Sequence, residues 1–423
     1  MFEGTNRLSR RLSVASLGLL GLIGVASGAK ADDQPATWHG FFTSGVAFTN
    51  SSQSYNGGLS RSADIERLTR VGLNIEKSLD ARWGYAAQLI ANGKTIKPDW
   101  AFVSWYPMKD LTLRIGKQKA PMWLVSDHID VGRTYPWVTP PEEVYSFNPV
   151  KRSSGFGATY RLALGGIEAV ADGLYSASST DTLDVVSGTK ADSALDVKVH
   201  YRRLAVVNLV VGNDAFQVRG VYAKAAVGIK TDYYQIHNLN AGFGAAGLKV
   251  ETHGFLLLSE YATIFGKVDQ SEVVGARENL VAAATSAATL GAKAQQTGSA
   301  ADIQAATAAG LGVQGAALQD AAVSQLVGSR GWYATTGYNI GAVMPYVTYA
   351  SLKNPENSHI VSQGSQVSAS GGIKYDANAY TDIKLQGQHV WPKDGTRGIQ
   401  DVDPSRTKYP QLNVFQAVID VAF

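Results

Sequence analysis

Charged side chains of both signs gather in one stretch of the chain, residues 119–153. This stretch carries the acids Asp127, Asp130, Glu142 and Glu143 and the bases Lys119, Arg133, Lys151 and Arg152. Three further bases precede it: Arg70, Arg114 and Lys117. Opposite charges that face each other across a narrow passage would create a field that selects solutes by sign and size. The competing interpretation is that they pair with one another or are solvated like ordinary loop charges.

The sequence contains no residue spacing typical of an enzyme or of a metal site. Its seven histidines form no HExxH pair, and neither a GxSxG nor a GxxxxGK[ST] motif is present. The absence of cysteine excludes disulfides and thiolate metal ligands. His128, beside Asp127, is more typical of a solvated loop histidine than of a ligand. We therefore expect no catalytic residue, no metal and no cofactor.

The first 31 residues have the layout of a secretory signal. Basic residues are followed by an apolar run over 12–25 and by small residues that end in Ala31, so cleavage is expected before Asp32. The run is shorter than the roughly 20 residues that a membrane-spanning helix needs. Cleavage would remove four of the 38 bases and one of the 35 acids, which leaves 34 of each. This balance gives no indication of nucleic-acid binding.

Beyond residue 36 the apolar residues alternate with polar ones in segments of about ten residues, which is the pattern of a transmembrane β-barrel. In 111–117 the apolar Leu111, Leu113 and Ile115 would face lipid, while Arg114 would face the lumen. In 70–76 the same parity turns Arg70 inward. The sequence predicts sixteen antiparallel strands, at 37–49, 63–77, 82–94, 97–107, 110–118, 154–163, 166–176, 191–202, 205–226, 233–245, 251–266, 331–340, 342–353, 365–376, 379–391 and 411–423. Two shorter elements within 205–226 are the alternative to one long strand there.

The connections between these segments alternate between short and long. Tight turns are expected at 78–82, 107–110, 164–165 and 376–379, on the periplasmic side, with longer polar loops outside. Aromatic residues such as Trp83, Trp105, Trp332 and Tyr349 fall where strand ends would meet the membrane interfaces. The last strand, ending in Phe423, must pair with the first to remove the free edges of the sheet.

Residues 267–330 depart from the alternating pattern because alanine, a strong helix former and a poor strand former, dominates them. We expect a long outer insertion with helices at 276–294, 300–309 and 314–327, and Ser299 with Asp302 capping the second helix. The insertion is interpreted as a tolerated surface addition, with a lid, a plug or a partner surface as the alternative.

Three stretches resemble the trimeric porins of proteobacterial outer membranes: 99–107 (DWAFVSWYP), 111–117 (LTLRIGK) and 130–145 (DVGRTYPWVTPPEEVY). The likeness resumes at 331–338 and 344–349 and ends at Phe423. It implies a homotrimer in which the loop after the fifth strand, here 119–153, folds into the lumen. It also implies that the barrel-assembly machinery recognises the terminal Phe423.

The expected protein is an all-β, 16-stranded outer-membrane barrel, 32–423, surrounded by lipid and acting as a passive channel for ions and small polar solutes. An anion-selective channel is the nearest alternative, because stacked lumen arginines would favour it and only Arg70 and Arg114 suggest one. An outer-membrane enzyme and a structural barrel with a blocked lumen compete with both kinds of channel.

Overall fold

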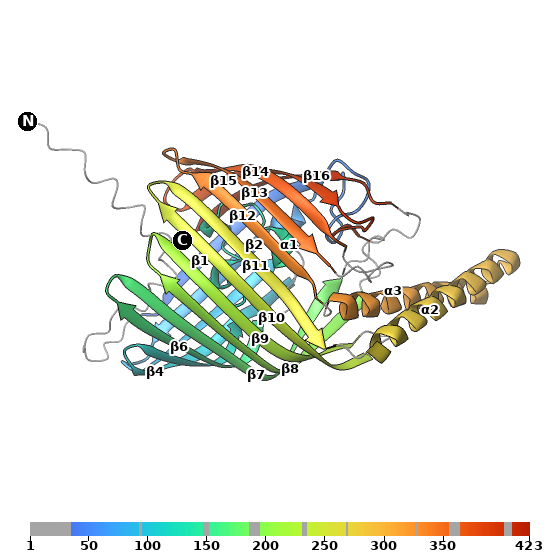
Figure 1. Ribbon diagram of the computed structural model, residues 1–423, viewed down its shortest axis with the longest axis horizontal. Coiled ribbons are helices and arrows are strands. Elements are labelled where there is room, and N and C mark those ends of the chain that lie inside the picture. Colours follow the sequence, from blue (N-terminus) through green and yellow to red (C-terminus); the bar gives the residue numbers. More distant parts are fainter. Residues whose placement is uncertain are drawn as a thin grey trace, which may run out of the picture.

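The computed structural model describes residues 35–92, 95–146, 152–185, 195–230, 235–267, 270–325, 328–354, 364–401 and 408–423. The expected signal segment, 1–31, and Lys151 lie outside the described residues. Within them, sixteen strands form one closed antiparallel barrel (Figure 1). The strands are β1 (Thr37–Thr49), β2 (Arg70–Ser78), β3 (Trp83–Asn92), β4 (Thr95–Met108), β5 (Leu111–Lys119), β6 (Arg152–Leu164), β7 (Ile167–Val185), β8 (Leu195–Gly212), β9 (Phe216–Lys230), β10 (Gln235–Thr252), β11 (Phe255–Lys267), β12 (Arg330–Tyr338), β13 (Val343–Lys353), β14 (Gln366–Asp376), β15 (Thr381–Pro392) and β16 (Leu412–Ala422).

The alternation of side chains across the wall follows the sequence pattern. On β12, Trp332 is 41 % exposed on the outer surface, whereas Tyr333 and Thr335 are fully buried inside the barrel. Val71, Leu73 and Ile115 are exposed, as their parity predicts. The outer surface is therefore apolar while much of the inner surface is polar, which suits a barrel that crosses a bilayer.

Five predicted strands are wrong in their bounds by seven residues or more at one end. The strands predicted at 166–176, 191–202 and 233–245 end later, at Val185, Gly212 and Thr252, and the segments predicted at 63–77 and 205–226 begin before the strands they correspond to. The segment predicted at 63–77 starts as a strand only at Arg70, because 64–69 turn through a short 3-10 helix, Glu66–Leu68, whose Arg67 N–H bonds to the Asp64 side chain. The segment predicted at 205–226 contains a turn at 213–215. There the Asn213 side chain accepts hydrogen bonds from the N–H groups of Ala215 and Phe216, at 2.9 and 3.1 Å, and separates β8 from β9.

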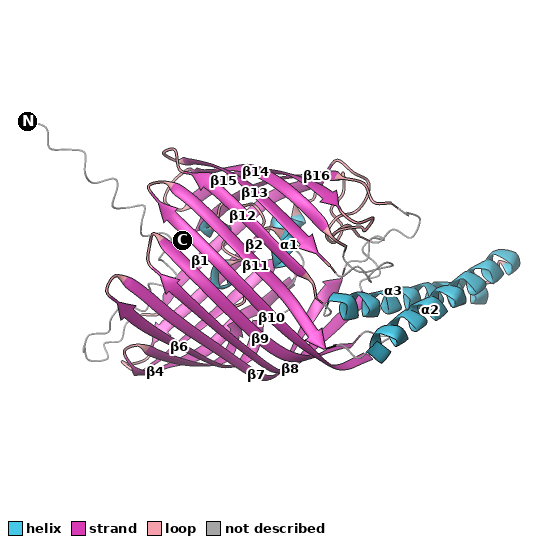
Figure 2. Ribbon diagram, viewed as in Figure 1, coloured by secondary structure: helices cyan, strands magenta, loops and turns pink. Residues whose placement is uncertain are grey.

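The insertion between β11 and β12 forms two helices, where three were predicted. Helices α2 (Gln270–Thr297) and α3 (Ala300–Gln325) pair as a hairpin that projects beyond one end of the barrel (Figures 1 and 2). The predicted gap at 310–313 is helical because α3 packs along α2. The Ser299 cap is confirmed, since its hydroxyl accepts the Asp302 N–H at 3.1 Å. Within the described residues, no helix is long and apolar enough to cross a membrane.

The first and last strands close the barrel. Nine residue pairs, from Phe41 opposite Ala422 to Thr49 opposite Val414, join β1 to β16. The backbone of Gly40 exchanges hydrogen bonds of 2.7 and 2.9 Å with that of Phe423. At Gly45 the two strands approach so closely that a Cβ atom would lie 2.2 Å from the Ala417 carbonyl oxygen.

We predict that Gly45→Ala weakens this closing pair of strands. The added methyl group must push β16 away, a cost of about 1–3 kcal/mol in free energy of unfolding. Thermal unfolding of the purified barrel in detergent measures the change. Gly220→Ala is the matched control because an added Cβ there meets no atom within 4 Å. Equal unfolding midpoints for the two variants would contradict the prediction.

Candidate functional site: the loop inside the barrel

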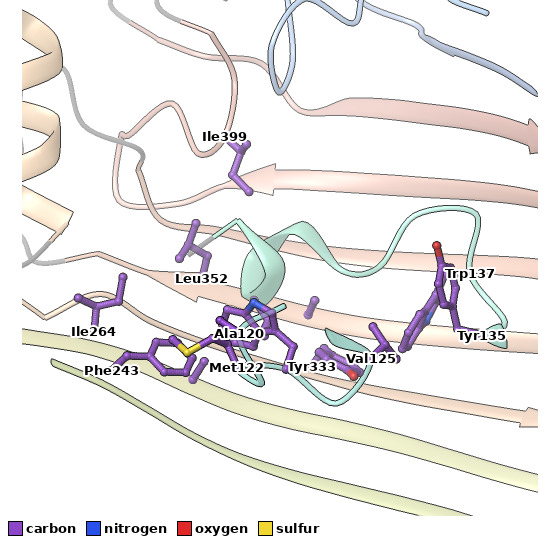
Figure 3. Packing of buried hydrophobic residues seen from close by; sticks show 14 of the residues in the cluster. Ala120, Met122, Val125, Tyr135, Trp137, Phe243, Ile264, Tyr333, Leu352 and Ile399 are labelled. Carbon is purple, nitrogen blue, oxygen red and sulfur yellow. The ribbon is translucent and has the colours of Figure 1, made fainter. Parts of the chain in front are cut away.

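The connection between β5 and β6 folds into the lumen. It includes the short 3-10 helices Ser126–His128 and Gly132–Thr134 and one helical turn, α1 (Glu142–Tyr145), which Figure 1 shows inside the barrel. Met122, Val125 and Trp137 of this inner loop pack against Phe243 and Tyr333 of the wall (Figure 3). The inner loop, residues 120–146, is therefore held by an apolar core that lies within the barrel.

Glu260 on β11 ties both ends of the inner loop to the wall. Its carboxylate accepts hydrogen bonds from the Leu124 N–H at 2.6 Å, the Tyr145 hydroxyl at 2.6 Å and the Tyr333 hydroxyl at 2.9 Å. The side chain is 2 % exposed, so these bonds replace water at a buried charge-bearing group. Leu124 near the start of the loop and Tyr145 near its end are thus fixed at one point.

Lys384 on β15 holds the middle of the inner loop. Its ammonium group donates to the carbonyl oxygens of Gly132 and of Trp137, the latter at 3.2 Å, and pairs with Asp420 at 3.0 Å. Lys384 is fully buried. A Cβ on Gly132 would lie 2.1 Å from the Asp420 carboxylate, so only glycine fits there.

Trp137, at the centre of the inner loop, bonds to two further strands. Its indole N–H is shared between the hydroxyls of Thr335 on β12 and Thr348 on β13, at 3.0 and 3.1 Å. The next residue, Val138, donates its N–H to the Gln386 side chain at 2.9 Å. Together with the Glu260 and Lys384 contacts, these bonds fix the loop against the β11–β16 part of the wall.

Several of the predicted charges meet at the β4–β6 part of the wall. Lys119 lies 3.0 Å from Asp130, and Arg152 lies 3.9 Å from Asp130. Both bases also pair with Asp99, which is fully buried. Acid and base are therefore in direct contact here. This agrees with the interpretation that these charges pair with one another, and not with the interpretation that they face each other across a passage.

The other predicted charges of the inner loop have different partners. Arg133 lies 3.5 Å from Asp376 on β14, so a loop base meets a wall acid. Glu143 accepts a 2.7 Å hydrogen bond from Gln366. Burial raises the pKa of Glu143, against hydrogen bonds from Ser368 and Gln366 that lower it. Glu142 begins α1, half-buried, and Asp127 is exposed.

The three wall bases predicted to line the lumen divide into two groups. Arg70 points inward and donates to the Tyr135 hydroxyl at 3.1 Å. Arg114 also points inward, where it bonds to the Thr159 hydroxyl at 3.0 Å and lies over the Phe102 ring. Lys117 does not join them. The register places it between Ala101 and Ser154, both exposed on the outer surface, and it bonds to the Pro98 carbonyl at 3.1 Å.

A polar chain along the inner wall leads from Arg114 to the inner loop. Thr159 donates to Asp172 at 2.7 Å, Asn208 donates to Asp172 at 2.9 Å, and Arg219 donates to Asn208 at 2.7 Å and to the Trp123 carbonyl. Sequence reasoning missed this chain and the partners Asp99, Glu260, Lys384 and Asp420. In the sequence, the only feature that marks these residues is that each is charged or polar at an inward-facing position of a predicted strand.

Comparisons with known proteins support the fold. No protein-family model and no curated protein matches this sequence. Solved structures match almost end to end: an anion-selective porin from Comamonas acidovorans (TM-score 0.55, 11 % identity, 92 % of this chain and 99 % of that one), a loop-deletion mutant of the outer-membrane protein OmpT from Vibrio cholerae (0.52, 9 %, 93 % and 100 %) and OmpF from Salmonella typhi in complex with daunomycin (0.51, 11 %, 93 % and 100 %). The resemblance to porins is thus confirmed for the fold.

We predict that Glu260→Leu loosens both ends of the inner loop. Two tyrosine hydroxyls and one backbone N–H would lose their buried acceptor, which lowers the free energy of unfolding by about 3 kcal/mol. Glu260→Gln keeps one acceptor oxygen, so its free energy of unfolding should fall by less than that of Glu260→Leu. Thermal unfolding of both variants in detergent provides the comparison. If Glu260→Leu unfolded at the wild-type temperature, the carboxylate would not be holding the loop.

Proposed function

We propose that this protein is an outer-membrane porin, a channel through which ions and small hydrophilic solutes diffuse. The observation that supports this most strongly is the inner loop, which enters a closed 16-stranded barrel and is bonded to the wall at Glu260, Lys384 and Trp137. A barrel of sixteen strands has room for an aqueous channel, and a fixed loop narrows it to a constant aperture.

In this proposal the charges that face water in the lumen, and not those in buried ion pairs, set the selectivity. Asp130 is paired with Lys119 and Glu143 accepts a hydrogen bond from Gln366, and these contacts hold the loop. Asp127 is exposed on the loop, and Arg114 is part-exposed on the wall. We propose these two as the charges nearest to a passing solute. We further propose that residues 1–31 are removed on export, that three copies assemble, and that the barrel-assembly machinery recognises Phe423.

A preference for anions is the second candidate. Among the described residues, no acidic oxygen lies within 4 Å of Arg114, and Asp172 is linked to it only through the Thr159 hydroxyl. In this candidate the Arg114 guanidinium attracts anions in the lumen. One of the similar structures is described as an anion-selective porin. That description applies to the other protein, which is 11 % identical to this chain. It is the reason to measure the ion preference of this one.

Current across a planar lipid bilayer tests the proposal. We expect purified protein to produce stepwise openings in groups of three, since each barrel would conduct separately. A salt gradient then gives the reversal potential, and its sign identifies the preferred ion. If the protein inserted into the bilayer and never conducted, the proposal of a channel would be overturned, and the result would indicate that the inner loop blocks the lumen.

We predict that Arg114→Gln moves the reversal potential toward cations. One unit charge about 7 Å from a passing ion contributes about 0.6 kcal/mol in water, favourable for an anion and unfavourable for a cation. Its removal should therefore raise the cation-to-anion permeability ratio by up to roughly seven-fold, and by less where salt screens the charge. Lys109→Gln, in the exposed turn between β4 and β5, makes the same change of charge outside the lumen and should leave the ratio unchanged. Identical ratios for both variants would show that Arg114 does not face the conducting path.

A further inference from the structure

A base and an acid lie on the same part of the inner wall, with one strand between them. Arg114 on β5 and Asp172 on β7 both point into the barrel, because they alternate with the outward-facing Ile115 and Tyr175. Strand β6 pairs with β5 on one side and with β7 on the other. Both charged side chains are part-exposed, so they present opposite charges to the lumen from neighbouring positions.

The hydroxyl of Thr159 on β6 sets the spacing between these two charges. It accepts a hydrogen bond of 3.0 Å from the Arg114 guanidinium and donates one of 2.7 Å to the Asp172 carboxylate. Thr159 itself is buried, 4 % exposed, and lies on the wall between the two groups. The guanidinium and the carboxylate are therefore separated by one hydroxyl group, and one small molecule can contact both.

Further contacts hold each charged side chain in place. The Arg114 guanidinium lies over the Phe102 ring, 5.5 Å from its centroid. The second carboxylate oxygen of Asp172 accepts a hydrogen bond of 2.9 Å from the Asn208 amide. Both groups are thus oriented before a solute arrives, which reduces the entropy that binding must cost.

The neighbouring charges of this wall are bonded differently. Arg219 is 7 % exposed and donates hydrogen bonds to two neutral oxygens. Arg161 and Glu168, nearer the short turn between β6 and β7, pair with each other at 3.3 Å. Arg114 and Asp172 combine partial exposure with a fixed separation between opposite charges, which neither of these neighbours does.

We propose that Arg114 and Asp172 form a binding subsite for small zwitterions of the α-amino-acid type. The carboxylate of the solute accepts hydrogen bonds from the Arg114 guanidinium, and its ammonium group donates to the Asp172 carboxylate, so both contacts are charge-assisted. A simple anion is repelled by Asp172 and a simple cation by Arg114, so each binds more weakly than a solute that carries both charges. The inference rests on the proposed channel, because a solute reaches this wall through the lumen.

The reduction of single-channel current by added solute at neutral pH measures binding at the subsite. We expect L-alanine to reduce the wild-type current in a saturable way, whereas lactamide, its uncharged isomer, should not. In Arg114→Gln and in Asp172→Asn the half-saturating concentration of alanine should rise roughly ten-fold, because each variant loses one charge-assisted hydrogen bond. Lactate and alaninamide, which keep only the carboxylate or only the ammonium group, should bind the wild type more weakly than alanine does.

The two single variants separate recognition of a zwitterion from a general effect of charge. They change the charge of the lumen in opposite directions, so they should shift the ion preference in opposite directions, yet both should weaken alanine binding. The matched control is Arg161→Gln/Glu168→Gln, which removes one base and one acid from the neighbouring ion pair. This control should bind alanine as the wild type does.

The outcomes distinguish the subsite from the channel. Variants are compared only where they conduct, since a conducting barrel is a folded one. Equal reduction of the wild-type current by alanine and by lactamide, or unchanged alanine binding in both single variants, would overturn the subsite and leave the channel standing. If the wild type never conducted, the channel would be overturned, and the subsite with it.

Discussion

The bilayer core offers no hydrogen-bond partner to a polypeptide backbone, and the rest of this structure depends on that constraint. A sheet that crosses the bilayer must close on itself, and here the closure is made where β1 meets β16. Closure turns alternate side chains outward and inward, so the outer surface becomes apolar and the interior collects polar groups. The closed wall provides the inner surface against which the inner loop packs.

The inner loop is in contact with the barrel wall through an apolar core and hydrogen bonds, and several charged side chains inside the barrel are paired with one another. Glu260, Lys384 and Trp137 fix the inner loop by hydrogen bonds, and an apolar core with Met122 and Phe243 supports them. The charges that the sequence brings together, above all Lys119 and Asp130, form ion pairs that hold the loop. Selectivity in the proposed channel therefore depends on the few charges left facing water.

The sequence predicts the number of strands correctly because the alternation of apolar and polar residues can be recognised within each strand separately. The sequence leaves the division of 205–226 open because alternating, mostly apolar stretches lie on both sides of Asn213, 204–211 and 218–226, and together they resemble one long strand. The partners of the inner loop could not be predicted, since parity turns Glu260 and Lys384 inward but does not say which loop residue meets them. The partner of each wall residue depends on the path of the loop across the lumen, which the local sequence does not determine.

The measurement that tests the fixed inner loop most directly is a cross-link between the loop and the wall. The chain has no cysteine, so Thr139→Cys with Gln416→Cys introduces one pair, at side chains whose oxygens lie 3.1 Å apart. A short thiol-specific cross-linker should join them within one folded chain and leave single-channel conductance unchanged, because the loop is already held there. A pair that fails to react, or a link that changes the conductance, would contradict a loop fixed inside the barrel.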